Sequence, residues 1–168
     1  MSKSKYFLEM SNVIHALVRG AILNNNFKQA YQSISLQLFP LFESSHQRDV
    51  ISFSKEKLQE IAFNLKYIDE ASIENSTCTS IALTIQATLF ANGVDSFFVI
   101  GVNNKDQRLN AHAWVDVPGM GYIDNKNEFT KYKEINRLSM YTAVERWFES
   151  ENENMDSDSR KNKSLFLV

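Results

Sequence analysis

The sequence contains a single cysteine, Cys78, among its 168 residues. One cysteine cannot form an intramolecular disulfide or a zinc site built from several cysteines, which are the two commonest structural uses of this residue. Cys78 is therefore either a buried packing residue or a reactive thiol. The base rate favours packing, because free cysteine is among the most buried residue types.

The sequence also lacks long apolar runs and an excess of one charge. No segment gives about 18 uninterrupted apolar residues, and the start, MSKSKYFLEMSN, lacks the apolar core and cleavage site of a signal peptide. We therefore expect a cytoplasmic protein with no membrane partner. The net charge is −2 and the lysines and arginines are scattered, so nucleic acid is not an expected partner either.

Composition and pattern predict one α+β domain that begins with helices. Hydrophobic residues at 43% and charged residues at 23% are sufficient for a globular core. Residues 1–70 are predicted to form a helical N-terminal segment, because apolar residues recur at spacings of three and four in three stretches, 12–23, 27–43 and 54–70. Ser54 is a natural N-cap for the third helix. Pro40 is expected to end or kink the second.

Residues 71–149 are predicted to contain a helix followed by antiparallel strands. The helix begins near residue 76 and stops at Asn92-Gly93, where glycine can adopt the left-handed conformation that closes a helix. Strand-like patterns then occupy 95–102, 111–117 and 121–125, separated by a polar loop at 103–110 and the turn PGMG.

The last part of the chain is predicted to be a helix and a tail. Residues 137–149 have a helical pattern, and residues 150–168 are expected to be a disordered tail, because 150–163 contain almost no apolar side chains. The closing SLFLV could dock on the fold.

Three residue types in this order point to nucleophilic catalysis. Cys78 lies at the predicted N-terminus of a helix. A helix N-terminus stabilises a thiolate and so lowers the pKa of a cysteine. A thiolate needs a base, and His112 is the best candidate because it lies on a strand next to a polar loop. His15 falls in an apolar helical run and His46 in a polar connection, so packing or solvation is the more common role for each.

The residue that orients His112 depends on the turn. Asp116 shares the strand face of His112 but lies about 13 Å away at roughly 3.3 Å per residue. A two-residue Pro118-Gly119 loop would bring Asn125 opposite His112, and a three-residue loop would make Asp124 its diagonal neighbour. A four-residue loop would turn Asp124 away. The sequence leaves these alternatives open.

The run STCTSIALTIQATLFANGVDSFFVIGVNNKDQRLNAHAWVDVPGMGYIDN resembles a known family. It is similar to the transglutaminase-like cysteine peptidase domain of lasso-peptide maturation proteins, the leader peptidases related to the C-terminal domain of microcin-processing proteins. The resemblance covers roughly residues 70–133. Its most specific parts are the cysteine at the start of an apolar helix, the NG stop followed by FFVIGV, and AHAWV.

The resemblance implies a transglutaminase-like or papain-like fold with its peptidase core in residues 71–149. It also implies a Cys-His-Asp triad, carried here by Cys78, His112 and Asp124, that cleaves the leader from a ribosomally made precursor peptide. No metal or organic cofactor is implied, and an ATP-dependent lasso cyclase acts on the product. Relatives that bind the leader unaided begin with a β-rich winged-helix-like domain, so a helical start predicts a separate leader-recognition protein. The alternatives are an acyl transferase and a non-catalytic peptide-binding scaffold.

Overall fold

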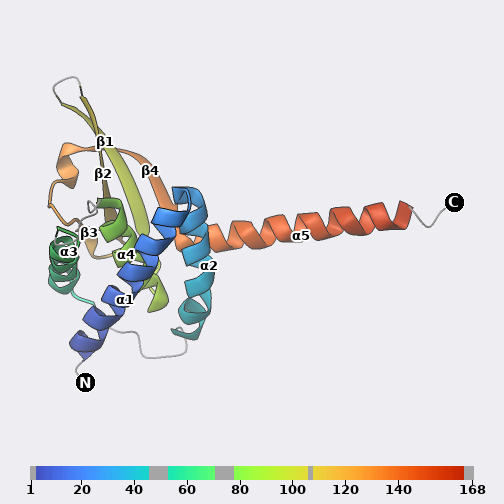
Figure 1. The fold of residues 1–168 in the computed structure, drawn as a ribbon, viewed down its shortest axis with the longest axis horizontal. Coiled ribbons are helices and arrows are strands. Elements are labelled where there is room, and N and C mark those ends of the chain that lie inside the picture. The colour runs from blue at the N-terminus through green and yellow to red at the C-terminus, as the bar shows by residue number, and fades with distance from the viewer. Residues whose placement is uncertain (1–2, 46–52, 71–77, 106–107, 165–168) are drawn as a thin grey trace.

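A computed structural model of the chain describes residues 3–45, 53–70, 78–105 and 108–164. Within these ranges, helices precede and cover a four-stranded antiparallel sheet (Figure 1). The α+β class predicted from the sequence is confirmed. None of the described helices is both long enough and apolar enough to span a membrane.

Three helices form the N-terminal segment. They are α1 (Lys3–Asn24), α2 (Phe27–Ser45) and α3 (Lys55–Glu70). Two lie where predicted, and the first begins at Lys3 instead of residue 12. Ser54 caps α3, because its Oγ accepts a hydrogen bond from the Lys57 amide at 3.2 Å. Pro40 does not end α2, which continues to Ser45. The lost backbone hydrogen bond is tolerated because Leu38 and Phe42, on either side of the proline, are both buried in the core.

Helix α4 (Cys78–Ala91) is the centre of the molecule. Every residue from Ser80 to Ala91 is buried, because α1, α2 and α3 pack around the helix and β2 lies against it. The helix ends at Ala91, just before the predicted stop at Asn92-Gly93. Gly93 has a φ of 82° and donates its amide to the Phe90 carbonyl at 2.9 Å. The predicted start near residue 76 lies outside the described residues.

The sheet has the order β3-β2-β1-β4. Its strands are β1 (Phe97–Lys105), β2 (Arg108–Val117), β3 (Gly121–Ile123) and β4 (Lys133–Ser139). The predicted polar loop at 103–110 is wrong, since Asn103 pairs with Asn110 and Lys105 with Arg108 in a continued hairpin. The sequence also gave no sign of β4, in which five of seven residues are exposed. Both stretches lack the apolar alternation that a strand on the core would have.

Helix α5 (Met140–Ser164) differs from its prediction at both ends. It starts at Met140 rather than residue 137, because residues 137–139 belong to β4 and the Ser139 Oγ accepts the Thr142 amide at 3.2 Å. It also continues through 150–164, in place of the disordered tail predicted there, and leaves the body of the fold (Figure 1). An established helix adds a backbone hydrogen bond with each residue, which favours such an extension.

Candidate active site

The turn between β2 and β3 has three residues. Val117 pairs with Gly121, so the loop is 118–120, and the Met120 amide donates to the Val117 carbonyl at 3.0 Å. Gly119 and Gly121 both have positive φ, 77° and 92°, a conformation that side chains with a Cβ rarely adopt. Of the three turn lengths open at the sequence level, the structure has the one that makes Asp124 the diagonal neighbour of His112.

His112 and Asp124 form a buried pair. The His112 Nε2 lies 2.7 Å from the Asp124 Oδ1, and each residue is 2% exposed. Burial alone would lower the pKa of His112, but the hydrogen bonds and charges of Asp124 and Cys78 raise it to about 9. Asp116 lies elsewhere, in an ion pair with Arg137 at 2.9 Å.

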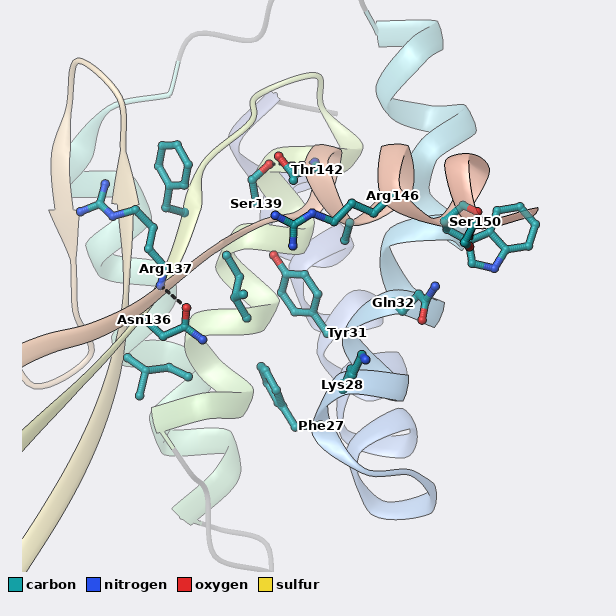
Figure 2. A pocket seen from close by; sticks show the side chains of 15 residues that line it. Phe27, Lys28, Tyr31, Gln32, Asn136, Arg137, Ser139, Thr142, Arg146 and Ser150 are labelled. Atoms are coloured by element: carbon teal, nitrogen blue, oxygen red, sulfur yellow. Dashed lines mark hydrogen bonds between the residues drawn. The ribbon is translucent and has the colours of Figure 1, made fainter. Parts of the chain in front are cut away.

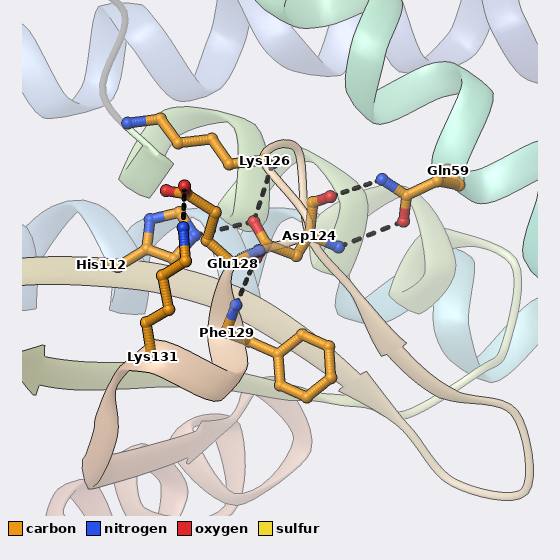
Figure 3. A network of polar contacts seen from close by, with 7 residues as sticks. All are labelled: Gln59, His112, Asp124, Lys126, Glu128, Phe129 and Lys131. Atoms are coloured by element: carbon orange, nitrogen blue, oxygen red, sulfur yellow. Dashed lines mark hydrogen bonds and ion pairs between the residues drawn. The ribbon is translucent and has the colours of Figure 1, made fainter.

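Asp124 is held by backbone amides as well as by His112 (Figure 3). Its Oδ1 accepts the Lys126 amide at 3.0 Å, and its Oδ2 accepts the amides of Glu128 and Phe129 at 2.6 and 2.8 Å. Burial would raise the pKa of this carboxyl, but the hydrogen bonds from His112 and these amides outweigh it and lower the pKa below its ordinary value. The carboxylate is therefore ionised and fixed in orientation.

Gln59 of α3 holds the backbone of Asp124 from the opposite side (Figure 3). Its Nε2 donates to the Asp124 carbonyl, and its Oε1 accepts the Asp124 amide at 3.3 Å. Sequence reasoning missed Gln59, because one polar residue on a predicted helix carries no signal of a partner 65 positions away. The helical N-terminal segment thus contributes directly to the position of Asp124.

Cys78 completes the group from the first position of α4. Its thiol interacts with the His112 side chain and the Ala113 backbone. Burial would raise the pKa of Cys78, but these hydrogen bonds, with the charges of His112 and Lys126, lower it below its ordinary value. Because Asp124 takes the Nε2 of His112, the Nδ1 is the ring nitrogen left for the thiol. The arrangement favours a thiolate beside an imidazolium.

Aromatic rings cover the other side of His112. The Tyr132 ring centroid lies 5.0 Å and the Trp114 centroid 6.1 Å from the imidazole. Gly101 pairs with His112 across β1 and β2, and a Cβ at Gly101 would meet the Trp114 ring at 2.6 Å. The glycine therefore leaves room for the Trp114 ring beside the imidazole.

The other candidates lie apart from this group. His15 is buried, with its Nδ1 2.8 Å from the Thr84 Oγ1, while His46 is outside the described residues. Asn125 is buried, but Asp124 is the residue that contacts His112. In the described part of the chain, no three His, Cys, Asp or Glu side chains are grouped as metal ligands.

The family model described as the transglutaminase-like superfamily matches residues 21–137. This range is more than half of the chain and includes Cys78, His112 and Asp124. It begins within α1 and reaches β4, so it is wider than the resemblance over residues 70–133. No curated protein and no solved structure matches the chain.

Proposed function

The chain belongs to the transglutaminase-like superfamily, and we propose that it is a cysteine peptidase that removes the leader from a ribosomally made precursor during lasso-peptide maturation. One observation carries the chemical part of this proposal. The only cysteine of the chain begins a buried helix beside a histidine that is itself held at 2.7 Å by a buried carboxylate. This is the geometry of an activated nucleophile, an adjacent base and a group that orients the base.

In the first half of the reaction, the Cys78 thiolate attacks the carbonyl carbon at the junction of leader and core. A C–S bond forms, and amides at the N-terminus of α4 can stabilise the negative oxygen. The imidazolium of His112 then donates its proton to the nitrogen of the leaving amine as the C–N bond breaks. The core peptide leaves with a free amine, and the leader remains as a thioester on Cys78.

In the second half, neutral His112 takes a proton from water. The hydroxide attacks the thioester, the C–S bond breaks, and the thiolate is restored beside the imidazolium. The leader leaves as a carboxylic acid, which loses its proton to water. Asp124 keeps the imidazole oriented in both halves, because three backbone amides hold the carboxylate itself in place.

The leader-peptidase assignment is supported by the resemblance of residues 70–133 to the maturation proteins. The precursor is then the substrate, and an ATP-dependent cyclase uses the freed amine. Because α1, α2 and α3 are helices rather than a winged-helix-like domain, a separate protein supplies leader recognition.

A reconstitution tests this proposal. The genes beside its own are first searched for a short precursor and a small leader-binding protein. The full chain is then incubated with these two products, and the masses of the resulting peptides are measured by mass spectrometry. We expect free leader and core peptide from the unmodified chain and neither from Cys78→Ala. A cross-linked or amidated leader would assign acyl transfer instead. An intact precursor, together with ordinary alkylation of Cys78 in mild acid, would favour a non-catalytic scaffold.

A further inference from the structure

A pocket of about 760 Å³ lies between α2, β4 and the first turns of α5 (Figure 2). Its apolar walls include Phe27 and Tyr31 from α2, Phe97 from β1 and Trp147 from α5. This volume is large enough for one bulky side chain of a ligand and the residues next to it, and is larger than a single ion needs. None of the catalytic candidates lines this pocket.

The charged residues that line the pocket are all cations. They are Lys28, Arg137 and Arg146. Arg137 is already neutralised by Glu134 and Asp116. Among the described residues, Lys28 and Arg146 have no ion pair, and Figure 2 shows them on opposite walls, on α2 and α5. In a chain of net charge −2, these two cations favour an anionic ligand.

Tyr31 adds a hydrogen-bond donor to the pocket wall. The residue is 5% exposed, and its hydroxyl lies beside the side chain of Gln86. Burial raises the pKa of Tyr31, so the hydroxyl keeps its proton at neutral pH. The acid close to this wall, Asp95, accepts hydrogen bonds from Ser139 at 3.0 and 3.2 Å. A carboxylate in the pocket would thus meet two cations, Lys28 and Arg146, and a tyrosine hydroxyl that carries no charge.

The pocket begins close to the catalytic candidates. Ile100 pairs with Ala113 on one side and Asn136 on the other, so these three residues form a row across β2, β1 and β4. The thiol of Cys78 interacts with the Ala113 backbone, while Ile100 and Asn136 line the pocket. At about 4.8 Å between strands, the row is about 10 Å long, or about three residues of an extended peptide.

We propose that this pocket is a substrate subsite for a bulky apolar residue next to an acidic residue, about three positions from the bond that Cys78 attacks. The aromatic walls bury the apolar side chain, and Arg146 and Lys28 bind the carboxylate. This inference rests on the proposed peptidase function, because it takes the ligand to be part of a peptide that reaches Cys78.

Binding is measured with two short fluorescent peptides that differ only in a central Glu-Phe or Lys-Phe pair, using the full-length Cys78→Ala chain and fluorescence anisotropy. We expect the acidic peptide to bind about tenfold more tightly, and Arg146→Glu to reverse this preference. The matched control is Lys133→Glu, which reverses an exposed charge on β4 outside the pocket and leaves the preference unchanged. Equal affinity for both peptides, or equal effects of the two reversals, would overturn the proposal.

A second measurement tests the distance to Cys78 and uses the unmodified chain. The acidic peptide extends three residues beyond its central pair on both sides, and we measure the rate at which iodoacetamide alkylates Cys78. We expect saturating peptide to slow alkylation at least about tenfold, and Arg146→Glu to abolish the protection. Binding without protection would refute the placement. Binding and protection without precursor cleavage would refute the peptidase function and leave the peptide subsite standing.

Discussion

Replacing Asp124 with asparagine tests how strictly the site requires a carboxylate. Each oxygen of Asp124 accepts two hydrogen bonds, Oδ1 from His112 and Lys126, and Oδ2 from Glu128 and Phe129. In Asp124→Asn, one of these oxygens becomes an NH₂ group, which donates. With its NH₂ toward Glu128 and Phe129, the amide leaves both of these donors without an acceptor. With its NH₂ toward His112, it leaves the Lys126 amide without one, while the Nε2 of a neutral His112 can accept.

The structure gives the size of the effect. A buried donor left without an acceptor costs about 1–3 kcal/mol, and one or two donors lose theirs, so we expect Asp124→Asn to lower the free energy of unfolding by about 1–6 kcal/mol. A neutral amide also no longer stabilises the imidazolium. Loss of a charge at this distance changes a pKa by about 1–3 units, so the His112 pKa falls and the thiolate fraction at neutral pH falls at least about tenfold.

Urea unfolding and the rate of Cys78 alkylation by iodoacetamide at neutral pH measure the two effects. The matched control is Asp116→Asn, which removes a partly exposed ion pair with Arg137. We expect this control to cost about 0–1 kcal/mol and to leave the alkylation rate unchanged. If Asp124→Asn matched the control in both measurements, the role given to the carboxylate would be wrong.

Three further changes have expected outcomes. Gly101→Ala places a Cβ 2.6 Å from the Trp114 ring, so we expect the free energy of unfolding to fall by about 1–3 kcal/mol. An unchanged midpoint of urea unfolding would contradict this contact. Gln59→Leu removes both hydrogen bonds to the Asp124 backbone; slower Cys78 alkylation is expected, whereas the unmodified rate would show that Gln59 does not position the carboxylate. The His112 pKa is about 9 in the folded chain and 6.5 ordinarily. This difference contributes about 3 kcal/mol to the free energy of unfolding, and the contribution is lost as the pH rises above about 9. That stability is fully present below pH 6.5, and a His112→Gln chain should lack this part of the pH dependence in urea titrations.

The sequence predicted the parts of the site that depend on local pattern. The helix that begins with Cys78 follows from its apolar spacing, and the strand around His112 from its alternation. The turn was left open, because PGMG is compatible with several loop lengths, although two glycines spaced as Gly119 and Gly121 fit a three-residue loop with two positive φ angles.

The sequence did not predict the parts that depend on tertiary contacts or on exposed backbone pairing. The side chains of strand β4 and of the outer part of the β1–β2 hairpin face solvent, so these segments show no hydrophobic alternation that would predict a strand. The contact between Gln59 and Asp124 exists only because α3 docks beside β3. Contacts of this kind leave no trace in local propensity.

The link between Gln59 and Asp124 makes the group of Cys78, His112 and Asp124 depend on tertiary assembly of the chain. Asp124 follows Cys78 by 46 positions, and Gln59 lies before both, so folding must bring three distant segments together before the carboxylate is held from both sides. Until then, Cys78 is an ordinary thiol with an ordinary pKa, mostly protonated at neutral pH. A nascent or partly unfolded chain therefore carries an unreactive thiol, and rapid alkylation of Cys78 becomes a marker of completed folding.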